Sequence, residues 1–442
     1  MVSLTALVFV ICVVPGIRAA SKAALHAKAV NQVCELTHDL KAATVDLVSL
    51  INNNKENLVA IEKAEQRAQL YYWKLGPNHT AWPKARVYAA FAARKRQVAE
   101  AAFAQLAAIA AETAGRSGLA AGRLDEFVNV FYTTAGSTNG CLTRTTLAQN
   151  KATHTDLAKC YSAPTTMTRI PTIIGAGAAQ PGTTATTITA KITSAVGKIK
   201  RNGANLADQA TQILGNGNQC EYLTTSGNHQ IFNTGELNLR FGDDLIIVTG
   251  GDNANTYTAW HDQPPAAARQ ATLADVATAL TKLKTPEATI AAAQKVLTIA
   301  GRELLASDVD MQKAYATVLG LARQSVTEQT IAAAFGTDDE SRFKSKFWTG
   351  FDSAEVETIS FNKEGSGTTK INLVPTVEDL TKALFFYQNK SINKLQKQAT
   401  ENGEGKISCQ TPGTKETKTP SKEDCKEHTE KDACQNAGCK FE

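Results

Sequence analysis

The chain has 442 residues and a formal net charge of +5, with 43% of its residues hydrophobic, 20% charged and only 6% aromatic. This length is enough for two or three domains with sizeable cores. Abundant alanine and few aromatic residues favour long helices packed through small side chains over an enzyme with bulky core layers. The mild charge, with both signs mixed along the chain, gives no reason to expect a nucleic-acid partner.

The N-terminal segment is typical of a secretory signal peptide. Residues 1–14 are mostly apolar, and Pro15, Gly16 and the small residues Ala19 and Ala20 follow. The apolar run is too short to cross a membrane, although the basic residues that usually precede such a run are missing. We expect cleavage near Ala19 or Ala20 and no membrane span later in the sequence. A buried N-terminal helix is the alternative.

Two long helices are predicted next. The apolar residues of the first alternate at three- and four-residue spacing from Val33 to Leu50, as in a coiled coil, and those of the second are spaced 4-7-4-4-3 from Val87 to Ile109. The first is expected over 21–75 and the second over 81–114, with Gly115 ending it. The turn between them is short, so they should pack as an antiparallel hairpin. The predicted seam positions are Val33, Leu36, Leu40, Ala43, Leu47, Leu50, Asn54, Leu58 and Ile61, then Val87, Phe91, Val98, Ala102, Leu106 and Ile109.

Residues 116–265 are rich in threonine, glycine and asparagine, and they predict a loop-rich head with short strands. The clearest strand is predicted at 244–249, and 170–182 are expected to form a loop. Helical periodicity returns at 271–335 and again at 376–398. The expected fold class is therefore mainly α, an elongated coiled-coil hairpin of long helices that carries the head.

The composition changes from Glu401 onward, where charged residues become frequent and large apolar residues almost vanish. Such a stretch cannot fold by burying apolar surface, so its cysteines would have to supply the cross-links. The predicted organisation is a signal peptide at 1–20, a helical rod and head domain at 21–395, a linker at 396–408 and a small disulfide-knit domain at 409–442.

The cysteines agree with export to an oxidising compartment. Of the 9 cysteines, Cys12 lies in the signal segment, and the others fall into two groups of four. Four cysteines allow three pairings, and no paired C-x-x-C spacing supports a zinc site instead. The two groups are Cys34, Cys141, Cys160 and Cys220, and Cys409, Cys425, Cys434 and Cys439.

The search for catalytic and ligand-binding motifs is negative. The glycines at 175–182 lack the spacing and the lysine of a phosphate-binding loop, and the 7 histidines are scattered. Asp243 and Asp244 suit a turn before the strand better than a pair of catalytic carboxylates. We predict no catalytic residue, no cofactor and no metal site; a secreted enzyme with a helical insert is the alternative from another class.

Two sequons are the chemically specific features. Asn78-His79-Thr80 lies in the predicted turn between the long helices, and Asn389-Lys390-Ser391 lies near the end of the last predicted helix. In a secreted chain, both Asn78 and Asn389 are candidate acceptors of N-linked glycans.

The whole chain resembles the variant surface glycoproteins of African trypanosomes. The resemblance rests on the signal peptide, the long hairpin with its early Cys34, the Thr/Gly-rich head, the late sequon at Asn389 and the charged linker. Its most specific part is the tail, which contains Cys425-Lys426-Glu427-His428, Asp432-Ala433-Cys434 and Gly438-Cys439-Lys440. The late sequon and the helix pattern suggest the class B subgroup.

The resemblance implies a function and a set of partners. The chain would be a coat glycoprotein that shields invariant proteins and supports antigenic variation and immune evasion. It would form a homo-oligomer, a dimer or a trimer, and host antibodies would bind it. A lipid anchor of the glycosylphosphatidylinositol type would hold it on the outer face of the plasma membrane. The sequence ends without the attachment signal of the family, and we therefore expect a truncated C-terminal domain. A related receptor for transferrin or haptoglobin-haemoglobin is the alternative.

The resemblance also implies one pairing of the cysteines. By analogy with the interleaved order of the family, Cys34 would pair with Cys160 and Cys141 with Cys220. The same order in the tail would pair Cys409 with Cys434 and Cys425 with Cys439.

Overall fold

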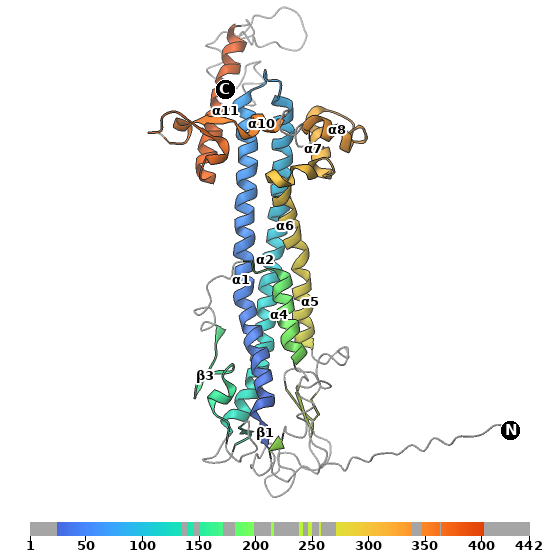
Figure 1. Ribbon diagram of the computed structural model, residues 1–442, viewed down its shortest axis with the longest axis vertical. Coiled ribbons are helices and arrows are strands. Elements are labelled where there is room, and N and C mark those ends of the chain that lie inside the picture. The colour runs from blue at the N-terminus through green and yellow to red at the C-terminus, as the bar shows by residue number, and fades with distance from the viewer. Residues whose placement is uncertain are drawn as a thin grey trace, which may run out of the picture. The chain divides into compact units, whose positions relative to one another are not determined.

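The computed structural model describes residues 24–134, 140–144, 151–170, 182–198, 214–215, 238–241, 246–249, 256–257, 271–336, 347–362 and 364–401. The chain divides into two compact units. The first consists of Met1–Ile61 with Arg94–Gly301, and the second of Glu62–Ala93 with Arg302–Glu442. Two long helices, the blue and the cyan ribbons of Figure 1, contribute residues to both units.

The two long helices are unbroken. Helix α1 (Ala27–Leu75) has 49 residues and α2 (Trp82–Thr133) has 52, so each is roughly 75 Å long at 1.5 Å per residue. Gly76 follows α1 with φ of 70°, the left-handed conformation that glycine adopts without strain at helix ends. Pro83 lies in the first turn of α2, where no backbone N–H is needed. The predicted hairpin is confirmed.

Burial follows the predicted seams closely. Asn54 is also buried, and its amide donates to the Leu50 carbonyl oxygen at 2.9 Å within α1. Leu58 and Ile109 are only partly buried. Val98, a predicted seam residue, is also only partly buried, and its neighbour Ala99 is buried instead. The seam residues that are buried are Val33, Leu36, Leu40, Ala43, Leu47, Leu50, Ile61, Val87, Phe91, Ala102 and Leu106.

The predicted end of the second helix at Gly115 is wrong. Helix α2 continues through Gly115, Gly118 and Gly122 to Thr133. Each glycine costs about 1 kcal/mol relative to alanine in a helix. Burial of the large apolar residues that continue the same stripe outweighs this cost, because each contributes roughly 1.5–3 kcal/mol. Those residues are Leu124, Phe127, Val128 and Phe131.

Among the described residues of the first unit, three shorter helices join the long pair. Helices α4 (Ala185–Lys198), α5 (Ala271–Lys282) and α6 (Lys284–Leu297) pack with α1 and α2 around one apolar core (Figure 1). Polar contacts join them at the edges: Lys191 lies 3.1 Å from Asp46 of α1, and Arg116 of α2 lies 2.7 Å from Asp275 of α5.

Short strands complete the first unit, as expected for the head. The predicted helix at 21–75 is corrected at its start, because Ala24–His26 form β1, which pairs parallel with β2 (Leu142–Thr143) and antiparallel with β5 (Leu214–Gly215). Two further antiparallel sheets are present. Their strands are β3 (Tyr161–Ala163) with β4 (Thr166–Met167), and β6 (Asn238–Phe241) with β7 (Ile246–Thr249) and β8 (Thr256–Tyr257).

Strand β7 matches the predicted strand at 244–249 from Ile246 onward. Residues 244 and 245 lie outside the described residues, as does most of the loop expected at 170–182. The signal peptide, Cys220 and the C-terminal domain also lie outside them.

The predicted helical region at 271–335 is confirmed but interrupted. After α6, a 3-10 helix runs over Ile299–Leu305, and α7 (Val309–Leu319) and α8 (Glu328–Phe335) follow. The Asp308 side chain caps α7 by accepting from the Asp310 N–H, and Gly320 and Gly336 end the two helices in the left-handed conformation. The cap at Asp308 and the glycines at 320 and 336 explain why residues 271–335 form several helices and not one continuous helix.

The second unit has an aromatic core. Tyr71 of α1 and Tyr88 of α2 both contact the rings of Phe347 and Phe351 at centroid distances of 5.3–5.9 Å. Trp348 stands perpendicular to Tyr88 at 4.9 Å. Phe351 lies in the short helix α10 (Thr349–Asp352), and edge-to-face pairs of this kind add stability beyond their buried area.

The last helix, α11 (Val377–Glu401), confirms the helix predicted at 376–398. It contacts α1 within the second unit, where the Gln66 amide donates to the Thr381 hydroxyl at 3.0 Å. Arg67 of α1 donates to the carbonyl of Asn372, which precedes α11 in the 3-10 helix Ile371–Leu373, at 2.9 Å. A hairpin of β9 (Glu355–Glu357) and β10 (Thr368–Lys370) lies beside it in the sequence. The mainly α fold class is confirmed.

Candidate functional site

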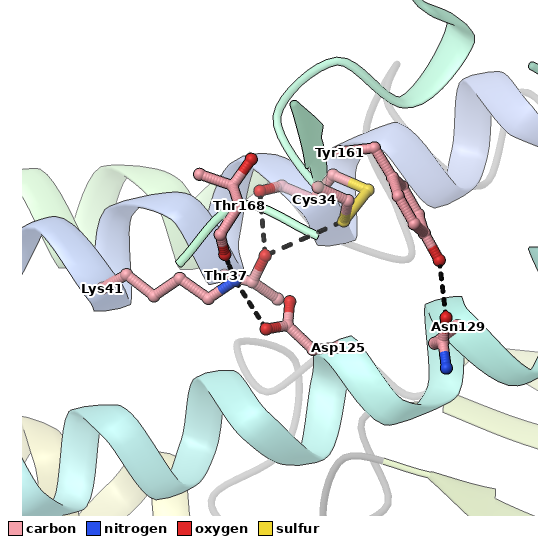
Figure 2. A network of polar contacts seen from close by, with 8 residues as sticks. Cys34, Thr37, Lys41, Asp125, Asn129, Tyr161 and Thr168 are labelled. Carbon is pink, nitrogen blue, oxygen red and sulfur yellow. Dashed lines mark hydrogen bonds and ion pairs between the residues drawn. A yellow bond between two sulfur atoms is a disulfide. The ribbon is translucent and has the colours of Figure 1, made fainter. Parts of the chain in front are cut away.

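A disulfide and a buried ion pair hold the segment 151–170 against the long helices of the first unit (Figure 2). Cys34 of α1 is bonded to Cys160, the pair that the resemblance implied. Nearby, the Lys41 ammonium forms an ion pair with the Asp125 carboxylate of α2 and donates to the Thr168 carbonyl oxygen at 2.7 Å. The segment is thus tied to both long helices.

Two further hydrogen bonds extend this network. The Thr37 hydroxyl donates to the Cys34 carbonyl oxygen at 3.1 Å, and the Tyr161 hydroxyl donates to the Asn129 side-chain oxygen at 2.9 Å (Figure 2). Burial raises the pKa of Tyr161, which keeps the hydroxyl protonated so that it remains a donor.

The electrostatics of the ion pair indicate a structural role. Burial raises the pKa of Asp125, and the hydrogen bond and the charge of Lys41 partly offset this effect. The Lys41 side chain is only 6% exposed, and its ammonium is engaged by Asp125 and Thr168. The network therefore has a structural role, because it ties the segment 151–170 to both long helices.

The remaining cysteines are only partly described. Cys141 is disulfide-bonded, but its predicted partner Cys220 lies outside the described residues. The pairing of Cys141 with Cys220 therefore stays a prediction. The same holds for the tail pairs, whose residues are Cys409, Cys425, Cys434 and Cys439.

The first sequon lies in the turn between α1 and α2, as predicted, and Asn78 is exposed. The turn is held by its own backbone, since the His79 N–H donates to the Gly76 carbonyl at 3.2 Å and the Trp82 N–H to the His79 carbonyl at 2.9 Å. The Ala81 N–H also donates to His79 Nδ1 at 3.1 Å. The middle residue of this sequon is thus turned toward the backbone.

The second sequon lies on α11, where Asn389 is exposed. The middle residue, Lys390, is held by Glu357, whose carboxylate lies 2.6 Å from its ammonium. This hydrogen bond raises the pKa of Lys390, so the contact remains charge-assisted at neutral pH. Both candidate acceptors are accessible to a glycan.

A cavity of about 320 Å³ lies in the second unit beside Asn78. Its lining includes Trp73, Lys74 and Asn78 near the turn, Lys390 and Lys394 on α11, and Glu357. Burial lowers the pKa of Lys74, and the neighbouring carboxylates Glu355 and Glu357 partly offset this effect. The lining combines the aromatic rings of Trp73 and Tyr387 with these charged groups.

Sequence reasoning missed one further polar cluster of the second unit. Arg302 donates two hydrogen bonds to Asp352, at 2.7 and 2.6 Å, and its guanidinium lies 3.9 Å from the centre of the Trp348 ring. Only 4% of Arg302 is exposed. Its partner is 50 residues away in the sequence, and no motif or periodic spacing could have linked the two.

Across the described ranges, no group of three or more histidine, cysteine, aspartate or glutamate side chains could hold a metal ion. Among the helices that the structure describes, none is long and apolar enough to cross a membrane.

Comparison with known proteins identifies the family. The model of the trypanosome variant surface glycoprotein (A-type) matches residues 5–388, which is most of the chain, so this protein belongs to the variant surface glycoprotein family. Among solved structures, that of MITat 1.1 is similar, with a TM-score of 0.62 and 15% identity, and the alignment covers 86% of this chain and 100% of that one. A search of curated proteins finds no match.

The family fixes the class of function. It is a family of surface coat glycoproteins and not of enzymes, so the chain is a variant surface coat glycoprotein of the cell surface. The alternative, a related receptor, is not favoured. The similarity to MITat 1.1 is too low in sequence to show more than the shared fold.

The subgroup suggested by the resemblance is corrected. The matching model is that of the A-type, whereas the late sequon and the helix pattern had suggested class B. A three-residue sequon and a helical period are too general to separate subgroups that share one architecture.

Proposed function

We propose that many copies of this chain form a dense coat, anchored by glycosylphosphatidylinositol on the outer face of a trypanosome plasma membrane. The coat masks invariant proteins from host antibodies, and variation of the chain supports immune evasion. The match of the family model over residues 5–388 carries this proposal. The two helices of 49 and 52 residues support it, because narrow helices suit dense packing on a surface.

The anchor is tested on living cells that express the complete gene. A phospholipase C specific for glycosylphosphatidylinositol should release the protein from intact cells into the medium, and antibodies should stain the unpermeabilised surface evenly. A protein that stays on the cells after this treatment, or that stains only after permeabilisation, contradicts the anchored coat.

We also propose that the protein is a homo-oligomer, a dimer or a trimer. Three large apolar side chains of the long helices are exposed in the first unit: Val48 at 54%, Val59 at 38% and Leu119 at 54%. A second apolar surface on a long helix is typical of association with another copy. Light scattering coupled to size exclusion should give the mass of a dimer or trimer for the glycosylated protein, and a monomer at all concentrations contradicts this proposal.

Asn78 and Asn389 are proposed as the glycan acceptors, because both are exposed and both lie in sequons. No catalytic activity and no cofactor are proposed. Peptide mass spectrometry of the protein from its own cells measures the occupancy of each asparagine.

A further inference from the structure

Helix α11 has an exposed apolar face opposite the one that it buries. Phe385 and Ile392 are 59% and 44% exposed. They are seven residues apart, so they lie on the same side of the helix. The side chains that α11 buries are Leu380, Ala383, Leu384 and Tyr387, and their spacing places them on the other side. Within the part of the chain that the structure describes, no segment covers Phe385 and Ile392.

Asn389 lies in the middle of this exposed face. It follows Phe385 by four residues and precedes Ile392 by three, the two spacings that bring helical side chains next to each other. Asn389 itself is exposed. The acceptor nitrogen of the second sequon is therefore flanked on the helix surface by an aromatic ring and a branched aliphatic side chain.

The rotation of α11 is fixed by its contacts on the buried side. Lys390 is bound to Glu357, and its ammonium lies 5.7 Å from the centre of the Phe386 ring and 5.8 Å from that of Tyr387. The Tyr387 hydroxyl accepts from the Glu357 N–H at 3.0 Å. These contacts hold the opposite side of α11 against its neighbours, which leaves Phe385, Asn389 and Ile392 exposed.

We propose that the N-linked glycan of Asn389 lies along α11 and covers Phe385 and Ile392. The proposal rests on the occupancy of Asn389, which is part of the proposed function. The first sugar of such a glycan presents C–H groups that pack on an aromatic ring, while its hydroxyl and acetamido groups stay hydrated. Covalent attachment gives the sugar a high effective concentration at this face, so weak contacts suffice to hold it there.

The size of the face favours a sugar over a second protein chain. Lys382, paired with Glu378 at 2.7 Å, limits the face one turn before Phe385. One turn after Ile392, Leu395 adds one more apolar side chain, 46% exposed, beside the exposed polar Gln396. A stable protein interface needs about 800 Å² from each partner, far more than these three side chains provide. A hydrophilic glycan in the centre would also keep another chain away.

The experiment uses the full chain, secreted from cells that attach N-glycans, with occupancy of Asn389 measured first by peptide mass spectrometry. Asn389→Gln removes the glycan without adding charge, and Asn78→Gln is the matched control at the other sequon. The readouts are binding of the dye anilinonaphthalene sulfonate, which fluoresces on apolar surfaces, and the midpoint of thermal unfolding. A Phe385→Ser/Ile392→Ser variant, with and without Asn389→Gln, completes a double-mutant cycle.

We expect Asn389→Gln to raise dye fluorescence several-fold and to lower the unfolding midpoint by a few degrees, while Asn78→Gln changes neither. In the Phe385→Ser/Ile392→Ser background, loss of the glycan should have no effect. Trimming the glycan to its first sugar should leave dye binding low, because that sugar makes the contact.

Three results would overturn the proposal. The first is unchanged dye binding in Asn389→Gln when the parent is fully occupied. The second is an Asn389 that carries no glycan, which leaves the coat function intact. The third is protection of Phe385 in the parent by a second copy, detected as cross-linking between chains at this position.

Discussion

At the scale of single residues, the ion pair of Lys41 and Asp125 carries the clearest energetic prediction. Replacing Lys41 with methionine keeps the length of the apolar stem but leaves the Asp125 carboxylate without its cation. Breaking a buried pair in this way costs about 3–5 kcal/mol, and the lower end is expected because 17% of the Asp125 side chain is exposed. Urea unfolding of the oxidised protein measures the loss.

The double variant Lys41→Met/Asp125→Asn is the control for this experiment. It removes both charges, so it should recover part of the stability that Lys41→Met loses. If Asp125→Asn alone destabilises as much as Lys41→Met, and the double variant recovers nothing, the two side chains act independently and the ion pair is not the source of the stability.

The same pair predicts a dependence on pH. Burial raises the pKa of Asp125 and Lys41 partly lowers it, so Lys41→Met should raise it further in the folded state. A carboxyl with a raised folded pKa contributes stability that is full below its unfolded pKa of about 4 and is lost as the pH rises through the folded pKa. The destabilisation by Lys41→Met should therefore be small at pH about 3 and grow towards neutral pH.

A pH series of unfolding measurements on Lys41→Met and on Lys41→Met/Asp125→Asn separates this effect from other groups. The difference between the two variants should increase with pH. A difference that is constant from acidic to neutral pH would mean that Asp125 is not charged when Lys41 is absent.

At the same scale, the sequence could predict which asparagines are candidate glycan acceptors. It could not predict which charged side chains form ion pairs. Asn78 and Asn389 were found because three adjacent residues define the acceptor. Lys41 and Asp125 lie on different helices, and only the register of the hairpin brings them together. Arg302 and Asp352 are likewise joined by tertiary packing, which leaves no periodic signal in the sequence.

At the scale of elements, the glycines of α2 give a test of what extends this helix. A Cβ added at Gly115, Gly118 or Gly122 would meet nothing within 4 Å. Alanine at each position should therefore stabilise the first unit by roughly 0.5–1 kcal/mol, through the lower conformational entropy of the unfolded chain. Chemical denaturation of the single variants measures the gain.

Gly301 provides the opposite control. A Cβ there would lie 1.8 Å from the Lys295 carbonyl oxygen, so Gly301→Ala should destabilise the junction that follows α6. A loss of stability in Gly115→Ala or Gly122→Ala would contradict the prediction.

Helices could be predicted wherever the pattern of apolar residues within one segment indicates them. The three- and four-residue spacing of Leu36, Leu40 and Leu47 is a property of one helix, and these residues are buried as expected. The end of α2 was misplaced because glycine is a weak signal when a buried stripe continues beyond it, as Phe127 and Phe131 show. Strand β1 was missed because three residues carry no measurable period.

At the scale of the whole molecule, the family was predictable and the subgroup was not. The order of signal peptide, hairpin, head, late sequon and cysteine-rich tail pointed to the family that the model over residues 5–388 then showed. An identity of 15% to a solved relative with a TM-score of 0.62 shows how little sequence this fold requires. At such low sequence identity, features that depend on few residues, such as the subgroup, cannot be predicted from the sequence.

The connectivity of the whole chain leads to a prediction about cleavage. Cys34 and Cys160 are 126 residues apart, and the exposed turn after Gly76 lies between them. If a specific protease site is inserted after Asn78 and cut, the protein should migrate as one species without reductant and as two fragments with it. Gel electrophoresis decides, and separation of the fragments without reductant would contradict the disulfide.

The Cys34–Cys160 disulfide makes the helical hairpin a closed covalent ring. A protein of the cell surface is exposed to proteases in the medium. A single backbone cut between residues 34 and 160 opens the ring but releases no peptide, because the disulfide still joins the two pieces. Two cuts within the ring are needed to release a fragment. The exposed turn that carries Asn78 can therefore be accessible to a glycan and to proteases at once, without becoming the point at which the molecule comes apart.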